Sequence, residues 1–169
     1  IHAFKGFGTI GVAGHNIKVG RGGIREIEFF AQTQQLIAGG RQIDLRQPDT
    51  IGALGRLTER GWIRAEVRDE LVDSYQFLRR IEHRLQMIAD EQTQKLPADA
   101  EGLLRLANFS GYTDTPAFAT ALVAHLERVQ RHYGALFEDV PELTHGTANM
   151  VFAGEQDDPD TVEALARMG

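Results

Sequence analysis

Cysteine is absent from the 169-residue sequence, so disulfide bonds and thiolate metal sites are impossible. No run of about 18 apolar residues occurs, so we expect no membrane-spanning segment. Acidic residues outnumber basic ones, 24 to 18, and the formal charge of −6 argues against a surface that coats nucleic acid. These absences fit the reducing cytoplasm, and we expect a cytoplasmic monomer that binds neither nucleic acid nor membrane.

The rest of the composition is that of an ordinary globular domain. Hydrophobic residues make up 42% of the chain and charged residues 25%, and the length is sufficient to bury a core. The sequence starts at Ile1 instead of a methionine and stops at Gly169 directly after a helical pattern. We therefore expect a piece of a longer protein.

The first 23 residues are rich in glycine and poor in helical pattern. Residues 1–15 carry four glycines among apolar residues, which disfavours a stable helix and predicts a loop with a short strand. Residues 16–19 predict a second short strand that stops at Gly20. We expect residues 1–23 to contain the last strands of a sheet and a glycine loop.

From Ile24 onward the apolar residues recur at helical spacing. The strongest repeat alternates by four and three and predicts a long helix that ends near Asp90, with Arg79, Arg80, Glu82 and Arg84 on its other faces. Two shorter helices are predicted to be capped by Thr50 and Asp99, and a further helix by Thr115. The repeat consists of Val67, Leu71, Ser74, Leu78, Ile81, Leu85 and Ile88.

These helices predict an all-α fold, an antiparallel helix bundle with a short β segment at its N-terminus. We expect the bundle to span residues 24–138. A linker and a C-terminal helix are expected over residues 139–169, where Asp158-Pro159 restarts a helical pattern.

The segment Gly20-Arg21-Gly22-Gly23, just before the first helix, is a candidate anion site. Glycines there allow backbone N–H groups to approach an anion, and the helix N-terminus adds partial positive charge, with Lys18 and Arg21 supplementing it. The alternative is a tight turn that needs positive φ and carries an exposed cation. The segment matches neither a P-loop nor a dinucleotide fingerprint.

Arg25, Glu26 and Glu28 follow directly. The two carboxylates lie about 200° apart around a helix, so they do not face one metal ion. Glu28 is one turn from Arg25 and could orient it toward a phosphate, or the two could form an ordinary solvated first turn. Histidines are scattered, and His125 and His132 lie two turns apart, which predicts structural roles.

Several motifs together resemble one enzyme family. They are Asn16 to Phe29, Gln34 to Ile37 with Gly39 to Arg41, Tyr75 to Gln86 on the long helix, and Asp90 to Pro97. This pattern is similar to the bifunctional glutamine synthetase adenylyltransferase/deadenylyltransferases, and a looser version occurs in PII uridylyltransferases. The resemblance covers residues 16–137, and it implies that residues 1–23 are the last strands and glycine loop of a truncated nucleotidyltransferase domain.

Asn16-Ile17-Lys18 and Arg25-Glu26 look like the N-terminal half of this family, which implies removal of AMP from adenylylated glutamine synthetase by phosphorolysis. The resemblance implies Mg²⁺, ATP, ADP and phosphate as ligands, with glutamine synthetase and the PII signal protein as partners. Lys18, Arg21, Gly22, Gly23 and Arg25 would contact phosphate, nucleotide or substrate, and Glu26 and Glu28 would orient them.

One part of the family pattern is missing. The family's Gly-Ser turn and Asp-x-Asp pair hold Mg²⁺, but this chain has no Gly-Ser, and Asp158 and Asp160 are separated by proline at the wrong end. We therefore expect no catalytic residue and no metal ligand here, and no turnover by the chain alone. Two alternatives remain: a regulatory module that docks PII or glutamine synthetase and couples the two halves, or a purely structural hinge.

Overall fold

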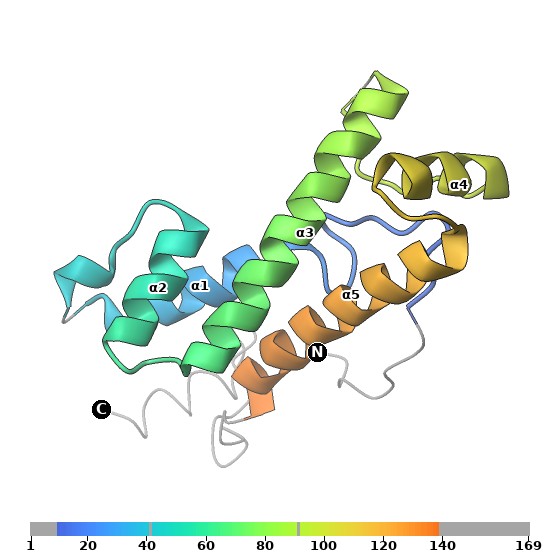
Figure 1. Cartoon of the computed structure of the whole chain (residues 1–169). Coiled ribbons are helices and arrows are strands. Elements are labelled where there is room, and N and C mark those ends of the chain that lie inside the picture. Colours follow the sequence, from blue (N-terminus) through green and yellow to red (C-terminus); the bar gives the residue numbers. More distant parts are fainter. Residues whose placement is uncertain (1–9, 41, 91, 139–169) are drawn as a thin grey trace, which may run out of the picture. The chain divides into compact units, whose positions relative to one another are not determined.

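The computed structural model describes residues 10–40, 42–90 and 92–138, and within these ranges the chain is helical. The all-α prediction is confirmed for the part of the chain described. The elements, shown in Figure 1, are α1 (Ile24–Ala38), the 3-10 helix η1 (Ile43–Leu45), α2 (Thr50–Glu59), α3 (Ala65–Ala89), α4 (Ala100–Phe109) and α5 (Thr115–Glu138). None of the described helices is long and apolar enough to cross a bilayer.

The apolar stripes of the helices form one buried cluster, as the helical periodicity predicted. The predicted repeat of α3 is buried at its five central positions, and Val67 and Ile88 are half-buried at its ends. Phe118, fully buried on α5, contacts Tyr112 edge to face at 5.6 Å between ring centroids. Burial of these side chains is the main source of stability, since each contributes about 1.5–3 kcal/mol relative to exposure.

Helices α3 and α5 lie side by side and run in opposite directions (Figure 1). Glu70 near the start of α3 contacts Arg131 and His132 late in α5, whereas Ser74, one turn further along α3, contacts the earlier His125. This order of contacts is that of two antiparallel neighbours in a helix bundle.

The strand expected over residues 16–19 is not formed. The Asn16 side-chain oxygen accepts hydrogen bonds from the amides of Lys18 and Val19, both at 3.0 Å, and this local turn bends the chain away from an extended course. An isolated antiparallel bridge joins Asn16 to Lys95. The Ile17 amide donates to the Gln94 carbonyl at 3.0 Å, and the Leu96 amide donates to the His15 carbonyl at 2.9 Å.

Two of the predicted N-cap residues are wrong by one position. Asp49, not Thr50, caps α2, because its carboxylate accepts from the Gly52 amide at 2.7 Å. Asp114, not Thr115, serves α5 in the same way through the Ala117 amide at 2.7 Å. Asp99 caps α4 as predicted, accepting from the Gly102 amide at 2.8 Å. In both cases the aspartate before the predicted threonine is the N-cap residue, in keeping with the stronger capping preference of aspartate.

The expected domain boundaries stay predictions. Ile10 and Ile17, in the described part of the 1–23 segment, belong to the same buried cluster as the helices. The expected linker and C-terminal helix over residues 139–169 lie outside the described residues, and so do Asp158 and Asp160.

Candidate functional site

The glycine loop before α1 is packed tightly against α5. Gly22 has a φ of +72°, and a Cβ on it would collide with the backbone of Leu126. A Cβ on Gly23 would lie 2.7–2.8 Å from the carbonyl oxygens of Gly20, Ile17 and Lys18. Both positions therefore require glycine, one for its backbone conformation and close approach, the other for space alone.

The backbone donors of this junction already have acceptors inside the chain. The amides of Ile24 and Arg25 donate to the carbonyls of Ile17 and Lys18 at 3.0 and 2.9 Å. Gly23 donates to the Gly20 carbonyl at 3.0 Å, and Gly22 donates to the Glu26 carboxylate at 2.9 Å. The backbone N–H groups at the start of α1 therefore have acceptors within the chain. The exposed groups of this junction are the side chains of Arg21 and Arg25. The predicted anion contact of Gly22 and Gly23 stays a prediction.

Lys18 is tied to α3 by a buried carboxylate. Its Nζ lies 3.5 Å from Oε1 of Glu82, whose side chain is 2% exposed, while Lys18 itself is 31% exposed. The other oxygen of Glu82 accepts a hydrogen bond from Arg79 Nη1 at 2.7 Å. Two cations therefore neutralise a carboxylate that would be costly to bury alone.

Arg21 is held by α5. With its amide oxygen turned toward the loop, the Gln130 side chain accepts hydrogen bonds from Nε of Arg21 at 3.1 Å and from Nη2. Gln130 is buried, at 7% exposure, whereas Arg21 is exposed. The buried Gln130 amide thus fixes one edge of the Arg21 guanidinium against α5.

The predicted orienting carboxylates have separate roles in the structure. Nη1 of Arg25 lies 3.4 Å from Oε2 of Glu28, and the Arg25 side chain is 65% exposed, so this contact is the ordinary intrahelical pair. Glu26 turns back to the Gly22 amide. Burial raises the pKa of Glu26, while the Gly22 hydrogen bond and the nearby Arg21 charge oppose that rise.

The structure thus brings the predicted residues into one junction, and it adds two that the sequence analysis missed. Glu82 was placed on a face of the long helix away from the core, and Gln130 was not singled out. A signal was present for both. Glu82 follows Leu78 by four residues and Ile81 by one, and Gln130 stands in the same relation to Leu126 and Val129. A polar residue in that position of an apolar seam borders the core.

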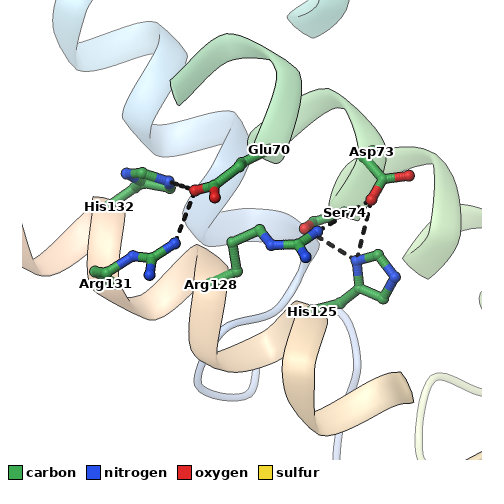
Figure 2. A network of polar contacts seen from close by, with 7 residues as sticks. All are labelled: Glu70, Asp73, Ser74, His125, Arg128, Arg131 and His132. Carbon is green, nitrogen blue, oxygen red and sulfur yellow. Dashed lines mark hydrogen bonds and ion pairs between the residues drawn. The ribbon is translucent and has the colours of Figure 1, made fainter. Parts of the chain in front are cut away.

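A second polar cluster joins α3 to α5 (Figure 2). The Glu70 carboxylate contacts Nε2 of His132 at 2.5 Å and Arg131 Nη2 at 2.7 Å. Asp73 accepts from Arg128 Nη1 at 3.0 Å. These contacts serve to join the two helices.

His125 completes this cluster. Its Nδ1 lies 3.1 Å from the buried Ser74 hydroxyl, and its ring stacks on Phe77 with 4.1 Å between centroids. Burial lowers the pKa of His125; the Asp73 carboxylate opposes this, and the Arg128 and Arg80 charges add to it. Interhelical contacts of this kind agree with the structural roles predicted for His125 and His132.

Among residues 10–40, 42–90 and 92–138 no group of three His, Asp or Glu side chains is placed to hold a metal ion. Mg²⁺ takes oxygen ligands from one or two carboxylates together with waters and substrate phosphates, and the expected position of its ligands outside this chain stays a prediction.

The chain belongs to the family described as GlnD PII-uridylyltransferase, whose profile matches residues 5–137. The names of its curated relatives are more specific than the name of the family. The chain is 58% identical to the bifunctional glutamine synthetase adenylyltransferase/adenylyl-removing enzyme of Mesorhizobium japonicum, 56% to that of Brucella melitensis and 55% to that of Agrobacterium fabrum. Each match covers the whole chain, which spans 17% of the length of each relative. The resemblance stated from the motifs is thereby confirmed.

Proposed function

We propose that the chain is a helical domain of an enzyme that regulates glutamine synthetase by reversible adenylylation, and that it belongs to the half that removes AMP by phosphorolysis. The relatives' names support the substrate protein and the two activities. The motifs Asn16-Ile17-Lys18 and Arg25-Glu26 support the adenylyl-removing half. The proposal includes a cytoplasmic enzyme that uses ATP, ADP, phosphate and Mg²⁺, with the Mg²⁺ ligands outside the described residues, and that responds to PII.

The observation that carries this proposal is the grouping of three cations at one junction. Lys18, Arg21 and Arg25 lie within eight residues of one another, and each is paired with a polar side chain of α1, α3 or α5. Arg21 and Arg25 remain exposed. Guanidinium groups with an outward edge suit the oxygens of a phosphate group, such as free phosphate or the phosphodiester of an adenylylated protein.

The test is phosphorolysis by the full-length enzyme. Arg25→Ala is expected to lower the rate of AMP removal from adenylylated glutamine synthetase roughly ten- to a hundredfold if it contacts the reacting phosphate. Arg105→Ala is the matched control, because Arg105 forms an exposed pair with Glu101 one turn away on α4. Equal rates for the two variants would remove Arg25 from the proposal.

The chain of 169 residues is expected to release no AMP by itself in the presence of phosphate and Mg²⁺. The reason is the missing Asp-x-Asp of the family pattern, without which the metal has no carboxylate pair. Turnover by the isolated chain at the rate of the full-length enzyme would overturn this part of the proposal.

A regulatory module is the second candidate, and an apolar surface favours it. Leu36 and Ile37 at the end of α1 are 82% and 65% exposed, and Ile43 in η1 is 74% exposed. A hollow of about 640 Å³ adjoins Leu36 and is also lined by Gln32, Gln35 and Arg46. Exposed apolar side chains that lie close together in the sequence, one of them beside a hollow, favour a contact with another protein.

The two candidates differ in what loop variants do to the full-length enzyme. If Arg21→Ala and Arg25→Ala leave basal phosphorolysis unchanged and abolish only the response to PII, the regulatory function is correct. If Leu36→Lys with Ile37→Lys abolishes that response at unchanged basal rate, the apolar surface is its contact. A structural hinge predicts that the loop variants lower stability without changing nucleotide affinity.

A further inference from the structure

Within the described residues, the buried polar side chains are Ser74, Glu82 and Gln130. Ser74 contacts His125 between α3 and α5. Each of the other two is paired with a cation of the loop before α1: Glu82 with Lys18 and Gln130 with Arg21. Burying a carboxylate or an amide costs free energy unless a partner compensates it. Here part of the compensation comes from the two cations that the resemblance predicts to be ligand contacts.

The Glu82 carboxylate restrains the Lys18 ammonium without occupying all of its N–H donors. Oε2 of Glu82 is hydrogen-bonded to Arg79, whereas Oε1 makes no hydrogen bond within the described residues and is matched by the Lys18 ammonium at 3.5 Å. An ammonium group has three N–H donors. Lys18, at 31% exposure, can face Glu82 and still direct a donor outward.

The Gln130 amide restrains Arg21 from the other long helix. Its oxygen accepts from Nε and one terminal nitrogen of the guanidinium, which leaves the remaining donors of Arg21 at the exposed edge. A neutral acceptor fixes the guanidinium without adding a counter-charge of its own, and the nearby Glu26 carboxylate is the negative group that interacts with Arg21. An amide at this position therefore orients the cation and preserves its attraction for an anion.

We propose that Glu82 and Gln130 are positioning residues, which hold Lys18 and Arg21 where both cations reach the phosphate group of the ligand. This inference rests on the proposed function, since it requires that Lys18 and Arg21 contact that ligand. Two antiparallel helices thereby fix the loop cations from separate sides. Neither positioning residue touches the ligand.

The experiment measures phosphorolysis by the full-length enzyme with inorganic phosphate as the varied substrate. Gln130→Met keeps the length of the side chain and removes the acceptor, and Glu82→Gln keeps its shape and removes the charge. Each is expected to raise KM for phosphate roughly tenfold while kcat changes by less than about twofold, because ligand placement is lost and the reacting groups are kept. Asp73→Asn, which loosens the α3–α5 contact to Arg128, is the control and is expected to leave KM unchanged.

A double-substitution cycle separates positioning from general stability. In an Arg21→Ala background, Gln130→Met is expected to cause no further rise in KM, because it acts through Arg21. Equal effects of Gln130→Met with and without Arg21 would overturn the inference. Glu82→Asp keeps the negative charge but shortens the side chain, which moves the carboxylate away from Lys18. A smaller rise in KM than with Glu82→Gln is therefore expected. If Glu82→Gln fails to fold, Glu82→Asp and Gln130→Met decide the inference.

The single variants Lys18→Ala and Arg21→Ala distinguish a failure of the proposed function from a failure of the positioning inference. If neither changes KM for phosphate, the ligand contact in the proposed function is wrong, and the positioning inference falls with it. If both raise KM and Gln130→Met does not, the contact stands and the positioning inference alone is overturned.

Discussion

Gly22 and Leu126 meet backbone to backbone, so that a Cβ on Gly22 would lie 2.6 Å from the Leu126 carbonyl carbon. The φ of Gly22 is +72°, a conformation that L side chains rarely adopt. Two independent reasons thus require glycine here. The loop that carries Arg21 can approach α5 only because this residue has no side chain.

Gly22→Ala is therefore expected to destabilise the protein by about 2–4 kcal/mol, from backbone strain and displacement of α5 together. Urea unfolding followed by circular dichroism measures it. Gly55→Ala in α2 is the matched control, since nothing lies within 4 Å of a Cβ there, and it is expected to stabilise by about 0.5–1 kcal/mol. A Gly22→Ala protein as stable as the parent would contradict the close contact.

Asp49→Ala is expected to lower stability by about 1 kcal/mol, because it removes the acceptor for the Gly52 amide at the start of α2. Thr50→Ala is expected to change stability by less than about 0.5 kcal/mol, since Thr50 is already inside the helix. Thermal unfolding of the two variants distinguishes the aspartate cap from the threonine cap. The reverse order of effects would restore Thr50 as the cap.

His125 is expected to make the protein less stable as the pH falls. Burial holds its pKa below 6.5 in the folded protein, so the unfolded chain binds the proton more readily. Its contribution is fully present above pH 6.5 and declines as the pH falls from there toward the folded pKa. His15, whose pKa burial also lowers, acts in the same direction.

The measurement is the free energy of unfolding from about pH 7.5 to 5.5, compared with His125→Gln. The variant is expected to be less stable at neutral pH, because it loses the stack on Phe77, and to show a shallower decline on acidification. An NMR titration of the His125 ring provides a direct check. A ring that titrates above 6.5 would reverse the sign of the effect.

Phe118→Ala is expected to cost about 3–5 kcal/mol, because the side chain is fully buried and its removal leaves a cavity beside Tyr112. Phe109→Ala, at the end of α4, is the matched control: Phe109 is 47% exposed, and its loss is expected to cost less than about 1 kcal/mol. Chemical denaturation measures both. Similar losses would show that the burial of α5 does not determine stability.

The main helices and much of their buried core were predictable from the sequence because apolar residues recur at helical spacing. The repeat from Leu71 to Leu85 specified the buried face of α3. The expected strand failed for a local reason that spacing does not reveal, the Asn16 side chain bonding to the amides of Lys18 and Val19. Periodicity does not resolve competition between a side-chain turn and a β ladder.

The loop residues of the candidate site were predictable from the sequence, but their partners on α3 and α5 were not. The glycines and cations around Arg21 are adjacent in sequence, so their grouping followed directly. Their partners Glu82 and Gln130 lie far along the chain, and which polar residue of a helix faces a loop depends on how that helix is rotated. That rotation is set by packing among α1, α3 and α5 and is not local information.

The pairing of the 14–17 segment with residues 94–97 has a consequence for the order of folding. The two segments are about 80 residues apart, and α1, α2 and α3 lie between them. Closing so long a loop costs chain entropy that the three backbone hydrogen bonds between the two segments do not offset by themselves. We therefore expect the intervening helices to assemble first and bring Gln94 back to Ile17, with this pairing forming late in folding and opening early in unfolding.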